Sequence, residues 1–421
     1  MNVLIFPAAT EIAAEMRRSL QYSKHFQIIG ASSDPSTNYG FDKYIGNVPD
    51  VSHPQFVKHF QKIVADNKIK LILPAHDDAI LTIAENAAAF LPAILVAPPL
   101  VTCAICRSKA KTYSTFPGIA PAETTNYPMF AKPDIGNGSR GVRVIHNEEE
   151  LNALPEGYVV REYLPGDEFT VDCFTDQSGV LLFASPRKRT RISGGIAVDT
   201  HAITEPRAVP FSSHKSSASI LIMADAVEMA DYINDTLVMR GAWFFQVKRD
   251  RNGRLKLLEI APRIGGSSGL WHAIGVNLVE LSLWDAIGEQ VHIIHNGINA
   301  RMTRRLDCRY HLPIKYDTAY IDLDDTILDE NGHVRPIMAA FIAQCEANGV
   351  TVGILTKGDT VAPWMIKHIP YLKCPRKKSD YIAPENAIFI DDSFAERREV
   401  SESLGIPVFD VAGVRALLNF Q

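Results

Sequence analysis

Cysteine, long apolar runs and unbalanced charge are all scarce in this chain of 421 residues. Only six cysteines occur, and only Cys103 and Cys106 lie close together, in the segment CAIC. No second pair or nearby histidine completes a zinc set, so we interpret both as small apolar side chains at the end of a strand. Such sparse use of cysteine favours a reducing compartment, and we expect a cytoplasmic protein.

Three absences exclude a membrane span, a signal peptide and a nucleic-acid partner. No apolar run reaches the roughly 18 residues that a membrane-spanning helix requires. The N-terminus lacks a basic start, and Glu11 and Glu15 interrupt its apolar stretch, so we expect no signal peptide. The net charge of −5 is modest for this length and leaves no basic footprint for nucleic acid. We therefore expect neither a membrane nor a nucleic-acid partner.

The composition present is that of a globular protein, with 46% hydrophobic residues in a chain long enough for two or three domains. Apolar runs at 2–6, in FQIIGASSD and in KLILPAHDD alternate with helical patterns at 11–20 and 57–64. This alternation predicts an α/β fold that opens with a Rossmann-like parallel sheet. The loop His76 to Asp78 follows such a strand, where ligands bind. It is compatible with a metal or substrate contact and equally with helix-capping carboxylates.

The segment YPMFAKPDIGNGSRGVRVI (127–145) predicts a phosphate-binding loop. A strand ends at Lys132, three glycines, a serine and an arginine follow, and a second strand begins. A glycine loop can fold its N–H groups over phosphates, and Lys132 adds a point charge. No GKS or GKT is present, so this is not a Walker motif, and a plain hairpin would need fewer turn residues. The loop contains Gly136, Gly138, Ser139 and Gly141.

Two later segments supply carboxylates and an amide. In YVVREYLPGDEFTVDCF, Glu162 and Glu168 flank a turn, where they can accept from adenine and ribose groups; simple solvation is the competing interpretation. In FFQVKRDRNGRLKLLEIAPR, Gln246 and Glu259 lie on two strands joined by a turn, and both offer the hard oxygen atoms that Mg²⁺ prefers. Arg263 follows at the strand end, where it can recognise an anion.

The order of these pieces resembles the ATP-grasp superfamily over roughly residues 1–310, and is most similar to the carbamoyl-phosphate synthetase large-subunit and D-alanine–D-alanine ligase branches. The resemblance implies ATP with Mg²⁺ (or Mn²⁺), an acyl phosphate, and small-molecule carboxylate and amine substrates. It implies that Gln246 and Glu259 hold the metal and that Arg263 steadies the transferred phosphoryl group. The implied ATP contacts are Lys109, Lys132, Gly136, Gly138, Ser139, Gly141, Glu162, Tyr163, Leu164 and Glu168.

Two positions depart from the family pattern, and one basic segment stays open. Ser108 precedes Lys109 where the family usually has Asp, and Ala261 stands where it usually has Asn. Alanine cannot ligate a metal, so water and Gln246 complete the coordination or the site is degenerate; we keep the active interpretation. The segment RKRTRISGG predicts a strand with alternating faces that binds an anionic substrate or is merely solvated. Its substrate candidates are Lys188, Arg189 and Arg191, with Arg187 on the same face as the two arginines.

Residues 318–421 begin a second α/β pattern in which three strands end in polar groups. Converging carboxylates repel each other unless a cation joins them, which predicts a Mg²⁺ site. The motifs YIDLDDT, GILTK and IFIDD resemble the haloacid dehalogenase (HAD) superfamily. This resemblance implies Asp322 as nucleophile, Asp324 as general acid/base, Thr356 as a phosphoryl contact, Lys378 rather than Lys377 as the lysine, and a phosphorylated metabolite as substrate. The implied metal ligands are Asp322, Asp324 and Asp391.

Only 34 positions separate Asp322 from Thr356 and 35 separate Thr356 from Asp391, which leaves no room for a cap domain. We therefore predict a Rossmann-like domain at 1–105, an ATP-grasp domain at 106–312 and a capless HAD-like domain at 316–421. The leading hypothesis is a bifunctional ligase and phosphohydrolase. A phosphotransferase without ligation and a regulatory or scaffold protein with a degenerate ATP site are the alternatives. A homodimer is compatible with these features.

Overall fold

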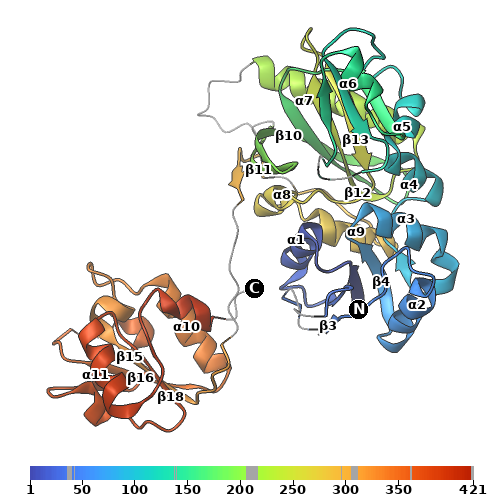
Figure 1. The fold of residues 1–421 in the computed structure, drawn as a ribbon. Coiled ribbons are helices and arrows are strands. Elements are labelled where there is room, and N and C mark those ends of the chain that lie inside the picture. Colours follow the sequence, from blue (N-terminus) through green and yellow to red (C-terminus); the bar gives the residue numbers. More distant parts are fainter. Residues whose placement is uncertain are drawn as a thin grey trace. The chain divides into compact units, whose positions relative to one another are not determined.

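The computed structural model describes residues 1–35, 40–41, 43–136, 138, 140–204, 217–294, 296–304, 312–360 and 363–418. The chain divides into two compact units, Met1–Arg305 and Leu306–Gln421, here named unit 1 and unit 2 (Figure 1). Within the described residues, no helix is both long enough and apolar enough to span a lipid bilayer.

Unit 1 opens with a five-stranded sheet in the order β3-β2-β1-β4-β5. All neighbouring strands are parallel, as the alternating sequence pattern predicts. Helices α1 and α3 begin directly after β1 and β4, at the capping residues Thr10 and His76. The elements are β1 (Asn2–Phe6), α1 (Glu11–Leu20), β2 (Gln27–Ala31), β3 (Lys43–Ile45), α2 (Phe56–Asp66), β4 (Ile69–Pro74), α3 (Asp77–Glu85) and β5 (Ile94–Leu95).

The rest of unit 1 contains a three-stranded sheet in the order β7-β6-β8 and a six-stranded sheet in the order β13-β12-β9-β10-β11-β14, both antiparallel. The elements are α4 (Leu100–Arg107), α5 (Lys109–Thr115), β6 (Met129–Pro133), β7 (Arg143–Ile145), α6 (Glu148–Asn152), β8 (Tyr158–Glu162), β9 (Glu168–Thr175), β10 (Leu181–Ser193), β11 (Ile196–Ala202), α7 (Ser217–Thr236), β12 (Gly241–Arg249), β13 (Leu255–Ala261), α8 (Gly269–Ala273), α9 (Leu278–Ala286) and β14 (Arg301–Thr303).

The two faces of the six-stranded sheet have different partners. Odd-numbered positions of β9, such as Val171 and Cys173, pack in a core with α7. Even-numbered positions, such as Thr170 and Asp172, point to the opposite side, because side chains alternate along a strand. Thr170 lines a cavity on that side.

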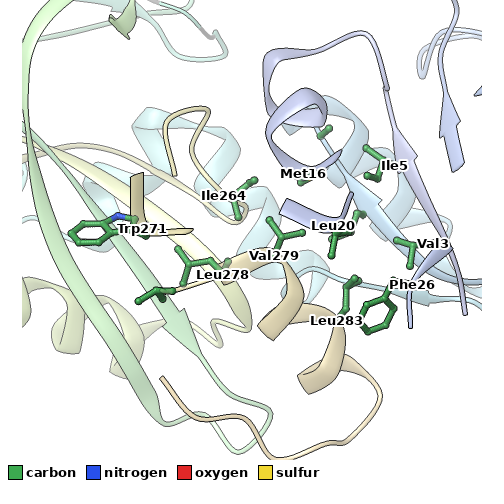
Figure 2. Close-up of a cluster of buried hydrophobic side chains, with 14 of the residues drawn as sticks. Val3, Ile5, Met16, Leu20, Phe26, Ile264, Trp271, Leu278, Val279 and Leu283 are labelled. Carbon is green, nitrogen blue, oxygen red and sulfur yellow. The ribbon is translucent and has the colours of Figure 1, made fainter. Parts of the chain in front are cut away.

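A shared core joins the first sheet of unit 1 to its later helices. Figure 2 shows Val3, Met16 and Leu20 of the N-terminal segment beside Val279 and Leu283 of α9. The cluster continues to Trp271 of α8, and all of these side chains are buried. The opposite face of the same sheet packs against α2 and α3. One face of this first sheet is therefore covered by helices from much later in the chain.

Unit 2 is a parallel sheet in the order β17-β16-β15-β18-β19. Helix α10 packs on one face and helix α11 on the other. The carboxyl ends of β15, β16 and β18 therefore meet at one edge, where ligands bind in such sheets. The elements are β15 (Thr318–Asp322), α10 (Pro336–Ala347), β16 (Thr351–Thr356), β17 (Tyr371–Lys373), β18 (Ala387–Ile390), α11 (Phe394–Leu404) and β19 (Val408–Phe409).

Truncating Leu283 should destabilise unit 1 because its buried side chain lies in the core that joins the two parts of the unit. We expect Leu283→Ala to lower the free energy of unfolding by about 2–5 kcal/mol. The matched change Leu221→Ala, at a position 62% exposed on α7, should alter it by less than about 0.5 kcal/mol. Urea unfolding followed by tryptophan fluorescence measures both, and equal effects would contradict the assigned core.

Candidate functional site

Lys132 lies at the end of β6 with its ammonium group buried inside unit 1. Its Nζ donates to the carbonyl of Leu258 at 2.8 Å and lies 5.2 Å from the centre of the Tyr113 ring. Burial lowers the pKa of Lys132 to about 8, although the nearby Glu259 carboxylate acts in the opposite direction; the charge of Lys109 adds to the lowering. Such a cation is poised for an anionic ligand that would stabilise its charge.

Lys109 is the first residue of α5, and its Nζ reaches the start of the glycine loop. It donates to the carbonyls of Asp134 at 3.2 Å and Gly136 at 3.3 Å. Burial lowers its pKa as well. Ser108 caps the helix, since its hydroxyl accepts from the backbone and also donates to the Asp134 carboxylate at 2.9 Å. Serine and aspartate are both good N-caps, which explains how Ser108 replaces the usual aspartate.

The glycine loop connects β6 and β7, as predicted. Gly138 and Gly141 have φ angles of 60° and 75°, a region that glycine enters without steric cost. The hydroxyl of Tyr158 donates to the carbonyl of Gly141 at 2.9 Å. Gly136 and Gly138 line the cavity that contains Lys132. The predicted contact Ser139 lies outside the described residues.

Gln246 and Glu259 face each other across β12 and β13 as direct register partners. Both line a cavity of about 120 Å³ together with the two lysines, and we name it the lysine cavity. Ala261 is buried opposite Phe244 and contributes no oxygen atom. The lining includes Lys109, Lys132, Gly136, Gly138, Arg140, Glu168, Gln246 and Glu259.

The turn between Glu162 and Glu168 does not form a hairpin, because β8 and β9 belong to different sheets. The backbone N–H of Ala122 donates to the Glu162 carboxylate at 2.8 Å. Glu168 lines the lysine cavity, and its carboxylate lies 3.2 Å from Nε of Arg189. The segment between the two strands therefore crosses from one sheet to the other. Its first residues are a half-buried Tyr163 and a buried Leu164.

A larger cavity of about 530 Å³ shares Gly138, Arg140, Gln246 and Glu259 with the lysine cavity. We name it the arginine cavity, since five arginines line it. Its walls come from the starts of α1 and α3, from the six-stranded sheet and from the segment after β13. The charged lining residues are Glu11, Asp77, Arg140, Arg187, Arg189, Glu259, Arg263 and Arg304.

Arg187 is held in the arginine cavity by a buried acidic partner. Its Nε donates to the Asp172 carboxylate at 2.6 Å, and both side chains are almost completely buried. The indole N–H of Trp271 donates to the same carboxylate at 2.8 Å. A Cβ at Gly265 would lie 2.9 Å from Nη2 of Arg187, so a glycine leaves the space that the guanidinium occupies.

The basic strand alternates only in its first half. Arg187 and Arg189 line the arginine cavity, whereas Lys188 pairs with Asp167 at 2.7 Å and is not part of that lining. The pairing register between β10 and β11 shifts after Arg189, and Arg191 is exposed. The prediction that Arg191 shares the face of the two arginines is wrong because this irregularity ends the alternation. Arg187 and Arg189 remain as candidates for binding an anion.

The HDD segment after β4 contacts arginines. His76 caps α3 by accepting from the Asp78 backbone N–H at 3.3 Å. Asp77 accepts two hydrogen bonds from Arg263, both of 2.7 Å, and Asp78 accepts one of 2.7 Å from Arg107. Burial raises the pKa of Asp77, but the charge and hydrogen bonds of Arg263 outweigh it and the net shift is downward. Asp77 and Arg263 both line the arginine cavity.

Cys103 and Cys106 lie within helix α4, so the prediction of a strand end is wrong. Their spacing places them on one helix face, and both are buried. Burial raises the pKa of Cys103 to about 12. These thiols therefore pack as apolar groups, as expected for their chemistry although not for their secondary structure.

In unit 2, Lys378 joins two of the predicted active-site carboxylates. Its Nζ donates to Asp391 at 2.6 Å and also to Asp322, and all three side chains are buried. The two carboxylates raise the pKa of Lys378, although burial acts to lower it. Asp322 ends β15, and Asp391 directly follows β18. The neighbouring Lys377 is exposed.

Among the described residues, Asp322, Asp391 and Asp392 bring one carboxylate oxygen each within 4.8 Å of one another. Asp324 is outside this group and instead accepts from the hydroxyl of Thr356 at 3.0 Å. The Asp324 side chain therefore lies apart from the predicted ligands Asp322 and Asp391, whereas Asp392 lies beside them. Thr326 fixes Asp392 through its hydroxyl, which accepts from the Asp392 N–H at 2.9 Å.

Sequence reasoning missed several residues of both sites. Asp392 carried a signal, since it directly follows Asp391 at a strand end. For Asp77 the signal was ambiguous, because its loop was equally compatible with a ligand contact and with a helix cap. Arg304 carried none: it reaches the arginine cavity from beyond β14 and pairs with Glu11 at 2.8 Å.

Gly265→Ala should disturb the Arg187 guanidinium, because the new methyl group would lie 2.9 Å from Nη2. We expect a loss of about 1–3 kcal/mol in the free energy of unfolding. Gly266→Ala meets only ordinary contacts, the nearest at 3.4 Å, and should be neutral or slightly stabilising. Urea titration of the two variants provides the comparison, and a stable Gly265→Ala protein would refute the crowding.

Residues 155–305 match the family described as "ATP-grasp in the biosynthetic pathway with Ter operon". Over 227 residues the chain is 27% identical to a 3-methyl-D-ornithine–L-lysine ligase of Methanosarcina acetivorans, covering 53% of this chain and 56% of that protein. A second such ligase, of Methanosarcina mazei, is 25% identical over 42% of this chain and 44% of its own length. The chain thus spans about half the length of these curated relatives.

Two solved structures share the fold. The biotin carboxylase domain of Hydrogenobacter thermophilus 2-oxoglutarate carboxylase has a TM-score of 0.55 at 16% identity, covering 71% of this chain and 72% of that one. The L-amino acid ligase from Bacillus licheniformis has a TM-score of 0.52 at 17% identity, covering 68% and 74%. The family match over residues 155–305 and the fold shared with these structures agree that unit 1 is similar to ATP-grasp proteins.

Proposed function

We propose that unit 1 is an ATP-dependent ligase that joins a carboxylate to an amine and forms ADP and phosphate. The observation that carries this proposal is the lysine cavity, where two buried ammonium groups lie beside the register pair Gln246 and Glu259. Buried cations without a full set of acidic partners favour a polyanionic ligand such as a triphosphate. The similarity to 3-methyl-D-ornithine–L-lysine ligases supports the same reaction class.

The oxygen atoms of Gln246 and Glu259 fit a magnesium ion. They belong to the hard ligand class that Mg²⁺ selects, and adjacent strands present them to one cavity. Ala261 offers no oxygen atom, so Gln246 and Glu259 would hold the ion, and phosphate oxygens and water would supply its other ligands. When bound, the ion neutralises phosphate charge and orients the transferred group.

The protein groups then have separate tasks. Lys132 and Lys109 would neutralise phosphate oxygens. Both side chains are buried, so little water would compete with this interaction. Glu168 would accept from the ribose. Arg263, at the border between β13 and the arginine cavity, would hold the transferred phosphoryl group as the substrate carboxylate attacks it. The amine then displaces phosphate from the acyl phosphate.

The size and charge of the arginine cavity favour ligation over simple phosphoryl transfer. Its volume of about 530 Å³ is within the range of small-molecule pockets. Arg187, Arg304 and Glu11 line it, and this mixture of charges suits substrates carrying both a carboxylate and an amine. A phosphotransferase would form ADP with a hydroxyl acceptor alone, and a degenerate scaffold would form none.

Lys132→Ala should abolish turnover without unfolding the protein, because its ammonium serves the ligand and not the apolar core. We expect ADP formation with mixtures of the standard amino acids to fall by about 10²–10³-fold. Lys70→Ala, at an exposed position of β4, is the matched control and should retain full activity. A coupled assay for ADP measures both variants, and full activity of Lys132→Ala would contradict the proposed ligase site.

Binding of ADP should be accompanied by proton uptake near pH 8. The pKa of Lys132 is about 8 in the free protein, where burial opposes its charge, and phosphate oxygens would raise it. A group whose pKa rises on binding takes up a proton between the two values, so affinity should fall as the pH increases beyond 8. Calorimetry in two buffers of different ionisation enthalpy detects this uptake. Identical heats in both buffers would contradict it.

We propose that unit 2 is a Mg²⁺-dependent phosphohydrolase of the haloacid dehalogenase type. The supporting observation is the convergence of Asp322, Asp391 and Asp392 at one sheet edge, with Lys378 between the first two. The three carboxylates fit a magnesium ion, which would offset phosphate charge. The Asp322 oxygen would attack phosphorus while the bond to the leaving oxygen breaks, and Asp324 would protonate that oxygen.

Asp322→Asn should remove phosphatase activity, since an amide is too weak a nucleophile to form the aspartyl phosphate. We expect the rate with p-nitrophenyl phosphate to fall by about 10³-fold or more in the full-length chain. Asp380→Asn, at an exposed position of the same unit, should leave the rate unchanged. Release of p-nitrophenol provides the measurement, and equal rates for both variants would refute the role of Asp322.

A further inference from the structure

The HDD segment of α3 includes one contact that the proposed reaction does not explain. Asp77, the first residue of α3, binds Arg263 across 186 positions of sequence. Nε of Arg263 donates to one carboxylate oxygen and Nη2 to the other, both at 2.7 Å. The side chains are only 12% and 17% exposed. This two-pronged geometry is the strongest form of an arginine–carboxylate contact and fixes the orientation of the guanidinium plane.

Two further contacts define the position of the same guanidinium. Its carbon lies 5.4 Å from the centre of the Phe244 ring, and Nη1 donates to the carbonyl of Ile264 at 3.0 Å. An arginine has five N–H groups, of which these bonds engage three. The two that remain belong to Nη1 and Nη2. Arg263 lines the arginine cavity close to Glu259, where the two cavities meet.

We propose that Asp77 is a positioning residue for phosphoryl transfer, acting through Arg263. This inference rests on the proposed ligase function, in which Arg263 holds the transferred group. A guanidinium fixed before the reaction stabilises developing charge without first reorganising. Displacement of a catalytic group by about 1 Å can cost on the order of 10²-fold in rate. Asp77 therefore contributes to the rate by orienting Arg263 and takes no part in the bonds that form and break.

The charge of Asp77 also predicts which kinetic constant changes. The Arg263–Asp77 pair is neutral overall, so it attracts the ground-state nucleotide less than a free arginine would. Its benefit appears when the phosphoryl group reaches the remaining N–H groups. Loss of Asp77 should therefore lower kcat, whereas the KM for ATP should stay similar or decrease slightly. An autoinhibitory contact would behave in the opposite way, because its loss would release Arg263 and raise the rate.

The first experiment compares Asp77→Asn with the wild-type full-length chain, using MgATP and a mixture of the standard amino acids. We expect kcat to fall by about 10–100-fold with the KM for ATP within about threefold, and partial recovery in Asp77→Glu. The matched control is Asp199→Asn. Asp199 accepts a similar pair of hydrogen bonds, of 3.0 and 2.5 Å, from Arg301, but neither residue lines the described cavities.

The second experiment tests whether Asp77 acts through Arg263. In an Arg263→Lys background, Asp77→Asn should cause little further loss of kcat, because the bidentate contact is already absent. Nitrogen-15 spectra of arginine Nε–H groups give a readout without turnover: the Arg263 signal should exchange slowly in the wild type and quickly in Asp77→Asn.

The outcomes separate this inference from the function on which it rests. Normal wild-type turnover with an unchanged or raised kcat in Asp77→Asn would refute the positioning role alone. The same conclusion follows if Asp77→Asn costs as much in the Arg263→Lys background as in the wild type. A wild-type chain that neither binds MgADP nor forms ADP would refute the ligase function, and the positioning role with it.

Discussion

The candidate ligase site depends on the buried core that the first sheet of unit 1 shares with α8 and α9. Met16 and Leu20 of α1 pack there against Val279 and Leu283, which come from far later in the chain (Figure 2). This core brings the starts of α1 and α3 to the segment after β13. Without it, Glu11 and Asp77 would not face Arg304 and Arg263. Apolar burial at one place therefore positions charged groups at another.

The cavities themselves are built from compensated charge. Arg187 is paired with Asp172 and Arg263 with Asp77, because an isolated buried ion costs several kcal/mol. Each pair keeps the guanidinium in place while reducing its net charge. Lys132 is different, since its direct partners among the described residues are a carbonyl acceptor and the face of Tyr113. Its lowered pKa is the electrostatic consequence. Arg187 and Arg263 are thus oriented by acidic partners, whereas the charge of Lys132 is left to be balanced by an anionic ligand.

In unit 2, the buried charges are compensated by one lysine that lies between two carboxylates. Lys378 bridges Asp322 and Asp391, which would otherwise repel each other in a buried position. The three strands that present these groups are adjacent and parallel, so their carboxyl ends meet without any long connection. The motifs on β15 and β16 are separated by one crossover, whereas the chain forms β17 at the sheet edge before it reaches β18.

Much of this arrangement could be predicted from the sequence, because local patterns determine local structure. The alternation of apolar runs and helical patterns predicted the parallel strands and α1, and the turn after Arg249 predicted that Gln246 and Glu259 lie on two joined strands. Asp322 and Asp391 were predicted to converge because strands of a parallel sheet end at one edge. Each of these inferences needs only the neighbours of a residue along the chain.

Contacts between distant segments could not be predicted in this way. The pairing of Asp77 with Arg263 and the position of Arg304 depend on how separate sheets pack, about which one strand's pattern carries no information. The register shift after Arg189, which removes Arg191 from the cavity face, depends on the partner strand. The sequence alone determined which chemical groups end each strand. Tertiary packing decided which of them meet, because burial forces every charged group to find a partner wherever the fold brings one.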